Sequence, residues 1–325
     1  MRHEDFLALR DSWRAKRPGL IDLAELNVYR SLGPGFAPIA PSTHAESPYR
    51  CHLAERYLAH LGLDAGLKAR TQVSHGVRRS LRALFGWLAS RRARLGVPED
   101  VYPVYLQLAD EAGVQVVRYA SREGLPALQA CDALLMCEPL KPWGRELGRE
   151  EAEQVEAWVR AEPGERVLLI DSAYATPPAP WVLRLMQEEL AFVLVSLSKG
   201  WLIPDHAGLC ITPSRWREDM RAAFAPLPKD ERKLRIGYAA LTEHAARPTE
   251  VRARLVEHAR ALDALTTRRP ELRASRCIGY FATSQCSFEE LLEQGVLGVP
   301  ASVFGGPEAL SILSSLPAAP SARAT

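Results

Sequence analysis

The chain has 325 residues, a formal net charge of +2, 47% hydrophobic residues and 25% charged residues. This composition is ordinary for a globular protein, excludes a largely disordered chain, and gives no charge-based reason to expect nucleic acid or an anionic membrane as a partner. The length predicts one large domain with a smaller one, or two domains of similar size.

The spacing of cysteine and histidine argues against a metal centre. The six cysteines and eight histidines occur at none of the spacings that metal sites use, so we expect the cysteines to be small core residues in a reducing compartment. The N-terminal residues lack the apolar core of a signal peptide, and no apolar run reaches the roughly 18 to 20 residues of a membrane span. We therefore expect a cytoplasmic protein that does not enter a membrane.

The first hundred residues are predicted to hold an arm and two helices. The first 50 residues are rich in Pro, Gly and Ser, which favours an extended N-terminal arm over residues 1–45. Helical spacing of apolar residues predicts a helix over 52–60 and an amphipathic helix over 78–96. The basic face of the second helix is expected to be solvated, and an anion-facing role for its first arginines is the alternative.

Five short apolar runs then alternate with helical patterns, at residues 113–119, 133–139, 166–174, 191–199 and 207–213. A charged helix is predicted after Gly144, between two of these runs. Strands that alternate with helices predict an α/β fold with a largely parallel sheet, whose ligands bind at the carboxyl ends of the strands. We expect this large domain to cover residues 46–213.

The remaining residues predict a second, smaller domain. The sequence after Ser214 shows helical spacing of apolar residues and many basic residues. Short segments typical of strands follow at 275–283 and 295–306. We therefore expect an α+β domain over residues 214–325, with a frayed C-terminal tail.

Two predicted strands end in residues of opposite charge. Asp171 closes the run RVLLID, and Lys199 closes the run FVLVSLSK. In a parallel sheet both side chains emerge at the same edge, and a lysine is almost never buried unless a partner or a reaction uses it. A salt bridge is one explanation of this pair, and a chemical role is the other.

Five short motifs favour the chemical role. The chain supplies, in order, SHGV (74–77), YPVY (102–105), CEPLKPWG (137–144), DSAY (171–174) and SLSK (196–199). The series resembles the fold-type I pyridoxal-phosphate enzymes, the aminotransferase class I/II superfamily that includes histidinol-phosphate aminotransferase. The resemblance covers roughly residues 45–212 and implies a three-layer large domain, the cofactor pyridoxal 5'-phosphate and a homodimer.

The resemblance implies roles for four residues around the cofactor ring. Lys199 matches the lysine that forms a Schiff base with the cofactor aldehyde, and Asp171 matches the carboxylate that pairs with the pyridine nitrogen. Tyr174 matches the tyrosine whose hydroxyl contacts the phenolate oxygen, and Tyr102 matches the aromatic residue that stacks on the ring. An ordinary buried tyrosine is the alternative for Tyr174 and Tyr102.

The resemblance also implies a phosphate site. Gly76 and Val77 open a helix whose backbone N–H groups suit a phosphate, and Gly76 permits close approach of the backbone. Ser196 and Ser198 offer hydroxyls beside the lysine, with simple strand-end serines as the alternative. Tyr49 matches a tyrosine that reaches the phosphate of the neighbouring subunit.

Lys141 is the first departure from the family pattern. It stands in EPLKPWG where the family has an asparagine that contacts the phenolate oxygen. A cation there is expected to stabilise the phenolate if the side chain points inward. A solvated side chain that points outward is the alternative.

The second and third departures concern missing arginines. The family has an arginine after the lysine that clamps the phosphate; here the text is SKGWLIPDHAG, so His206 or Arg78 is expected to supply the positive charge. The family also has a late arginine that grips the substrate carboxylate, and the matching text PEALSILSSLP has none. Arg235 and Arg276 are only loose candidates to replace it.

The resemblance implies an aminotransferase that acts on a small amine or amino acid, as a specialised biosynthetic member. The first alternative is a non-transaminating enzyme on the same fold, such as an eliminase, decarboxylase, cyclase or oxidase. The second is a degenerate member without turnover. Retention of Lys199, Asp171 and Tyr174 argues against the degenerate member, whereas the missing arginines argue for it.

Overall fold

The computed structural model describes residues 3–43, 49–204, 207–228 and 230–318. Its centre is a seven-stranded sheet with the strand order β2-β8-β7-β6-β5-β3-β4 among these residues. The strands are β2 (Thr71–Ser74), β3 (Arg94–Pro98), β4 (Gln115–Tyr119), β5 (Ala133–Cys137), β6 (Val167–Asp171), β7 (Ala191–Ser196) and β8 (Gly208–Ile211). Strands β3 to β7 pair in parallel, and β8 runs antiparallel to both of its neighbours. The prediction of a mostly parallel sheet is confirmed.

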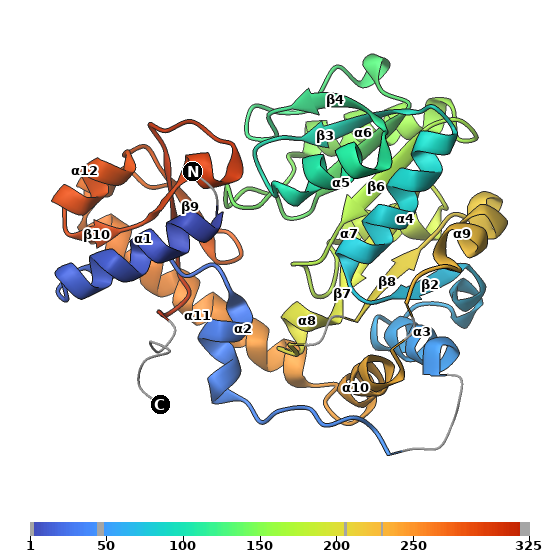
Figure 1. Cartoon of the computed structure of the whole chain (residues 1–325), viewed down its shortest axis with the longest axis horizontal. Helices are drawn as coiled ribbons and strands as arrows, with labels where there is room; N and C mark the ends of the chain where they lie inside the picture. The colour runs from blue at the N-terminus through green and yellow to red at the C-terminus, as the bar shows by residue number, and fades with distance from the viewer. Residues whose placement is uncertain (1–2, 44–48, 205–206, 229, 319–325) are drawn as a thin grey trace.

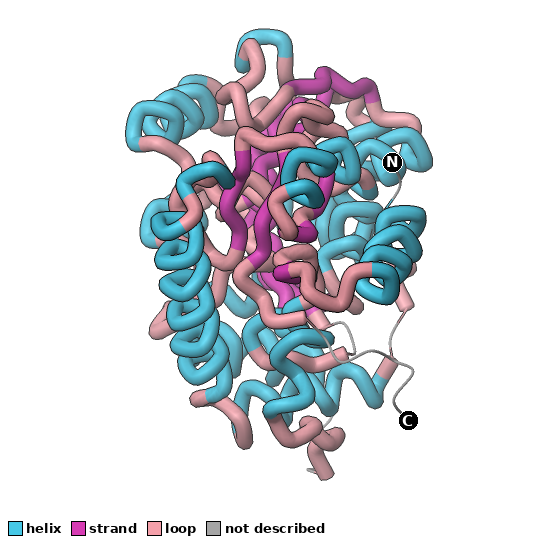
Figure 2. The backbone as a smooth tube through the Cα atoms, turned by 90° about the vertical axis from the view of Figure 1, so that its left-hand side faces the viewer, coloured by secondary structure: helices cyan, strands magenta, loops and turns pink. Residues whose placement is uncertain are grey.

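Burial explains why the central strands read as continuous apolar runs. Every residue of β5, β6 and β7 is buried, because helices cover both faces of the sheet. One face packs on α4 (Val77–Ser90) and α5 (Val104–Ala112). The other packs on α3 (Tyr49–His60), α6 (Arg149–Ala161) and α7 (Pro180–Gln187). The result is a three-layer large lobe, seen with its helices and strands in Figures 1 and 2.

A small lobe lies beside the sheet, on the left in Figure 1. It contains the antiparallel sheet β11-β12-β9 and the parallel pair β1-β10. The strands are β1 (Ile21–Asp22), β9 (Phe281–Ser284), β10 (Val296–Leu297), β11 (Val299–Pro300) and β12 (Ser311–Ser314). With α12 (Phe288–Glu293) and the long helix α11 (Arg247–Arg268), it forms the expected α+β unit. Helices α9 (Arg217–Phe224) and α10 (Glu231–Thr242) pack instead on the large lobe. The exact boundaries 46–213 and 214–325 stay a prediction.

The extended arm expected over residues 1–45 is wrong for its first half. Residues His3–Lys16 form the helix α1, and β1 pairs with β10 of the small lobe. Phe6 is fully buried, and Leu9 and Trp13 pack beside it at helical spacing. The Pro and Gly residues that suggested an arm belong to the later segment, where α2 (Val28–Leu32) and a short 3-10 turn precede an irregular stretch.

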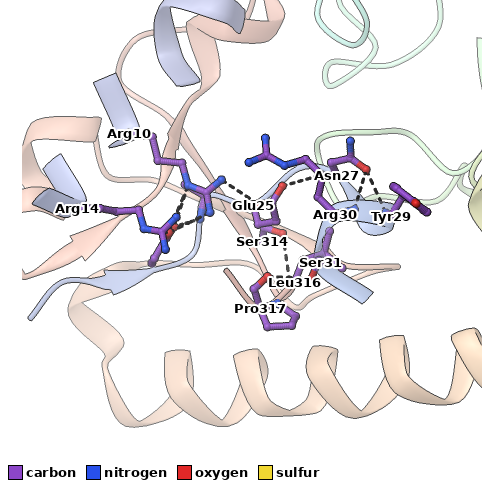
Figure 3. A network of polar contacts seen from close by, with 12 residues as sticks. Arg10, Arg14, Glu25, Asn27, Tyr29, Arg30, Ser31, Ser314, Leu316 and Pro317 are labelled. Atoms are coloured by element: carbon purple, nitrogen blue, oxygen red, sulfur yellow. Dashed lines mark hydrogen bonds and ion pairs between the residues drawn. The ribbon is translucent and has the colours of Figure 1, made fainter. Parts of the chain in front are cut away.

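A buried ion-pair network joins α1 to the segment around β1 (Figure 3). Arg10 donates to Asp22 and to Glu25, with nitrogen–oxygen distances of 2.9 and 3.0 Å. Glu25 also accepts from the backbone of Asn27, whose side chain caps α2. The network fixes α1 to β1, and β1 belongs to the small lobe because it pairs with β10 and because the Leu23 amide donates to the Leu297 carbonyl.

The sequence pattern missed the two strands β2 and β3 of the central sheet. The helix expected over 78–96 ends at Ser90, and a turn with a positive φ at Arg92 leads into β3. The four-residue edge strand β2 is too short to show a period.

No helix of the described residues is long and apolar enough to span a bilayer. Within the same residues, no cluster of three or more His, Cys, Asp or Glu side chains suits a metal ion.

Candidate active site

The carboxyl ends of β6 and β7 bring Asp171 and Lys199 to one edge of the sheet. Asp171 is the last residue of β6 and pairs in register with Leu194 of β7. The strand β7 ends at Ser196, and the short helical turn α8 (Leu197–Gly200) then carries Lys199. Lys199 therefore lies one turn beyond the strand end at which it was expected. Its amine lies over the Tyr174 ring, 5.1 Å from the ring centre.

Asp171 takes its hydrogen bonds from groups other than Lys199. The Tyr105 hydroxyl donates to Oδ2 at 2.5 Å, and the Ala173 amide donates to Oδ1 at 2.9 Å. The same hydroxyl lies 2.9 Å from the sulfur of Cys137. Burial raises the pKa of Asp171 above its ordinary value, while the Tyr105 bond opposes this shift. A simple salt bridge between Asp171 and Lys199 is therefore not what holds this edge together.

Two tyrosines leave aromatic surface uncovered at this edge. Tyr102 is 39% exposed and Tyr174 is 40% exposed, which is unusual for large aromatic side chains beside a buried sheet. Tyr102 packs edge-on against Tyr105, with ring centres 5.3 Å apart. The alternative of fully buried core tyrosines is wrong for both, because each presents part of its ring to solvent.

The turn before α4 lies close to the strand end of β7. Gly76 has a φ of 88°, which favours glycine, and it precedes the first turn of the 14-residue helix α4. A Cβ on Gly208 would lie 3.0 Å from the Gly76 Cα, so this close approach requires glycine at position 208. Gly208 in turn pairs in register with Ser196. The first amides of α4, including that of Val77, have no partner within a helix and suit an anion.

Hydroxyl groups and one arginine complete this turn. The hydroxyls of Ser196 and Ser198 are buried and lie 2.7 Å from each other. Arg78, in the first turn of α4, donates to the Tyr102 hydroxyl at 2.7 Å. The structure thus joins Arg78 to the expected ring-stacking residue. His206 lies outside the described residues, and of Tyr49 only the backbone, at the start of α3, is described.

Lys141 points inward, so the alternative of an outward, solvated side chain is wrong. Its amine donates a hydrogen bond to the Tyr280 hydroxyl. The same nitrogen lies 3.2 Å from the centre of the Tyr174 ring, 3.5 Å from that of Tyr280 and 4.6 Å from that of Phe281. Two amines, those of Lys141 and Lys199, therefore lie over the same Tyr174 ring.

The loop that carries Lys141 packs directly on the small lobe. Gly144 has a φ of 59°, and a Cβ there would lie 2.1 Å from the carbonyl oxygen of Phe281. The Thr283 hydroxyl donates to the carbonyl of Trp143 at 2.8 Å. These backbone contacts hold the loop against β9 and thereby bring Tyr280 to Lys141.

Burial lowers the pKa of both lysines. The pKa of Lys199 falls because of desolvation, against the attraction of Tyr102 and Asp171. The pKa of Lys141 falls well below its ordinary value because of desolvation and repulsion by Lys199. The site therefore favours neutral amines over ammonium ions compared with free lysine.

Neither loose candidate for a carboxylate clamp belongs to this group. Arg276 is 87% exposed and lies 4.0 Å from Asp263. Arg235 lies on α10, with its side chain 3.9 Å from Glu231. No contact of either with Lys199, Lys141 or Tyr174 is found in the described part of the chain.

Two site residues were missed by sequence reasoning. Tyr105 lies in the YPVY motif, three residues after Tyr102. Because residues one helical turn apart lie on the same face, this spacing could have predicted that Tyr105 lies near Tyr102 in the site. Tyr280 comes from the small lobe, 139 residues after Lys141, and the sequence holds no local signal for their contact.

Two surface cavities lie away from these site residues. One, of about 430 Å³, lies beside Arg70, and the other, of about 620 Å³, lies between α4 and α9.

Comparisons with known proteins reveal similarity in structure. No family model and no curated protein matches the sequence. Substrate-bound BacF from Bacillus subtilis has a TM-score of 0.70 at 14% identity, covering 98% of this chain and 91% of its own. An aspartate aminotransferase double mutant from Thermus thermophilus has a TM-score of 0.68 at 20% identity, covering 96% and 90%.

A third solved structure extends this likeness. The histidinol-phosphate aminotransferase from Clostridium acetobutylicum has a TM-score of 0.65 at 15% identity, covering 91% of this chain and 94% of its own. At such low identity the likeness establishes architecture and leaves the activity to be argued from the residues. The chain has the fold of the fold-type I aminotransferases, as its five motifs predicted.

Proposed function

We propose that this chain is a pyridoxal-phosphate-dependent aminotransferase acting on an amino acid or amine. The single observation that carries the proposal is that Asp171 ends β6 and Lys199 follows the end of the neighbouring parallel strand β7, beside the half-exposed Tyr174 ring. An aminotransferase fold around this placement supports it.

The residues present fit the cofactor. A flat ring can cover the exposed surface of Tyr102, which is 39% exposed. The carboxylate of Asp171 is held in place and can accept a further bond from a pyridinium N–H. Gly76 with its positive φ, and Gly208, where a Cβ would crowd Gly76, leave room for a phosphate at the start of α4.

The cofactor, when bound, supplies a ring that withdraws electrons from the substrate Cα. Lys199 would hold the cofactor through its amine and then accept and return the Cα proton. The lowered pKa of Lys199 suits both tasks, since each needs a neutral amine. Asp171 would keep the ring nitrogen protonated, and Tyr105 would keep Asp171 oriented.

A non-transaminating enzyme on the same fold is the second candidate. The specific observation that favours it is Lys141, a second amine beside Lys199. Lys141 would give the site a second group that can donate or accept a proton, whereas transamination requires only one. A homodimer and a cytoplasmic location remain predictions.

Borohydride trapping tests the cofactor and its lysine. Full-length protein is incubated with pyridoxal phosphate, reduced with borohydride and digested. Mass spectrometry is expected to find the cofactor on the peptide that contains Lys199. The variant Lys199→Ala is expected to lose this label, whereas Lys68→Ala, an exposed lysine paired with Glu55, keeps it. No label on the native protein would overturn the proposal.

A donor screen tests the reaction. Incubation of the loaded protein with single amino acids or amines is expected to give pyridoxamine phosphate and the matching keto product. Release of ammonia, carbon dioxide or peroxide without pyridoxamine phosphate would select the second candidate instead.

A further inference from the structure

We propose that Lys141 and Tyr280 hold the carboxylate of the substrate, which makes the substrate an amino acid rather than a simple amine. We call these two residues the Lys141–Tyr280 pair. The inference rests on the proposed function, since it places the carboxylate in the same site as Lys199.

The Lys141–Tyr280 pair presents hydrogen-bond donors without a matching acceptor. A neutral lysine amine has two N–H donors and an ammonium group three, and Lys141 uses one of them on the Tyr280 hydroxyl. A hydroxyl that accepts this bond keeps its own proton to donate elsewhere. Among the described residues, no carboxylate forms a hydrogen bond or ion pair with either side chain. A carboxylate would satisfy both donors at once.

Aromatic rings form the remaining surroundings of the Lys141 amine. The rings of Tyr174, Tyr280 and Phe281 all lie within 4.6 Å of this nitrogen. Ring faces attract a cation, but they supply no strong acceptor. They also keep water away, so an ion pair formed here is stronger than one at the surface.

The charge balance around the Lys141–Tyr280 pair favours an incoming anion. Within the described part of the chain, the ionisable groups that face Lys141 are Lys199, Asp171, Cys137, Tyr174 and Tyr280. Asp171 is the one carboxylate among them, and it is already bonded to Tyr105 and Ala173. Because burial and Lys199 lower the pKa of Lys141, a bound carboxylate is expected to restore the ammonium form and to draw in a proton.

The Lys141–Tyr280 pair also stands in the right place to position a substrate. Lys141 follows β5 of the large lobe, and Tyr280 precedes β9 of the small lobe. Both Lys141 and Lys199 lie over the Tyr174 ring, so a molecule that reaches Lys199 lies within reach of the Lys141–Tyr280 pair. The strongly exposed Arg276 has no such position.

Calorimetric titration with a charged and an uncharged probe tests the inference. Propionate carries a carboxylate, and propionamide has nearly the same shape without the charge. Full-length protein is titrated with each probe, both as purified without cofactor and after loading with pyridoxal phosphate. The variants are Lys141→Met, which keeps the length of the side chain, and Tyr280→Phe, which removes only the hydroxyl. Arg276→Ala is the control for a surface cation.

The inference predicts a selective loss. Lys141→Met is expected to weaken propionate binding by about tenfold or more, and Tyr280→Phe by about three- to tenfold, with propionamide unchanged. Arg276→Ala is expected to change neither. Titration in two buffers of different ionisation enthalpy is expected to reveal proton uptake with propionate, which Lys141→Met abolishes.

Other results would overturn the inference. Unchanged propionate binding in both variants, or equal losses for propionate and propionamide, would leave the Lys141–Tyr280 pair with only a structural role. If Lys141→Met fails to fold, the inference is judged from two other results: propionate binding by Tyr280→Phe, and proton uptake by the native protein when it binds propionate. Failure to bind pyridoxal phosphate would refute the proposed function alone, because the propionate titration of the cofactor-free protein still decides the role of the pair.

Discussion

The Tyr105 hydroxyl donates a hydrogen bond of 2.5 Å to Asp171 Oδ2, across the sheet edge from Lys199. Both Tyr105 and Asp171 are buried, so the bond replaces water that the carboxylate has lost. The bond opposes the rise that burial produces in the pKa of Asp171. It therefore helps to keep Asp171 charged and fixed in orientation.

Tyr105→Phe is expected to raise the pKa of Asp171 further and to weaken cofactor binding by about five- to tenfold. The reason is that the carboxylate loses a donor that favours its charged form. Absorbance titration with pyridoxal phosphate between pH 6 and 9 measures the change, and the defect should be largest at the acidic end. Tyr119→Phe is the matched control, since its buried hydroxyl donates to the Leu135 carbonyl instead. Equal weakening in both variants would point to packing alone.

Arg78→Ala is expected to weaken cofactor binding by about five- to twentyfold, because it removes both a cation at the α4 N-terminus and the donor to the Tyr102 hydroxyl. Equilibrium dialysis with pyridoxal phosphate, repeated at two salt concentrations, measures the loss. Arg79→Ala removes the neighbouring exposed arginine and is expected to have little effect. A loss for His206→Ala equal to or larger than that for Arg78→Ala would contradict this assignment.

The alternation of apolar runs with helical patterns was enough to predict the core of the sheet. Strands β5, β6 and β7 are buried along their whole length, so their sequences show burial directly. The edge strand β2 and the antiparallel direction of β8 carry no such signal, because pairing depends on distant residues. The helix α1 was missed since the composition of the first 50 residues, taken as a whole, hid the helical spacing of Phe6, Leu9 and Trp13.

The candidate site was predictable where residues follow strand ends. Asp171 and Lys199 lie at neighbouring strand ends, so topology alone brings them to one edge. The contact between Lys141 and Tyr280 joins two lobes and needs the close approach of Gly144 to β9, which no local pattern reveals. The inward orientation of the Lys141 side chain therefore could not be predicted from the sequence.

Glu138→Gln is expected to stabilise the protein at alkaline pH only. The buried carboxyl of Glu138 has its pKa raised to about 7 by desolvation and by Glu146. Because the folded pKa lies above the unfolded value of 4.5, the contribution of this group to stability is complete below about pH 4.5 and is lost as the pH rises through 7. Glutamine, which does not ionise, should raise the free energy of unfolding by about 3 kcal/mol at pH 8 and by little at pH 4.5.

Urea unfolding at pH 4.5 and pH 8 measures this difference. Glu146→Gln serves as the control, since it removes only the exposed repulsive partner and should give a smaller gain at pH 8. The same gain for Glu138→Gln at both pH values would mean that the effect comes from shape rather than from ionisation.

Arg10→Met is expected to lower the free energy of unfolding by about 3 to 5 kcal/mol, since it leaves two carboxylates without their buried cation. The side chains of Arg10 and Glu25 are both 2% exposed and that of Asp22 is 10% exposed, so little water can replace the lost partner. Arg14→Met is the matched control. Arg14 also approaches Asp22, at 3.4 Å, but it is 30% exposed, and its loss is expected to cost about 1 kcal/mol or less. Urea unfolding of the three proteins at neutral pH measures the difference, and equal losses for the two variants would show that burial does not govern this network.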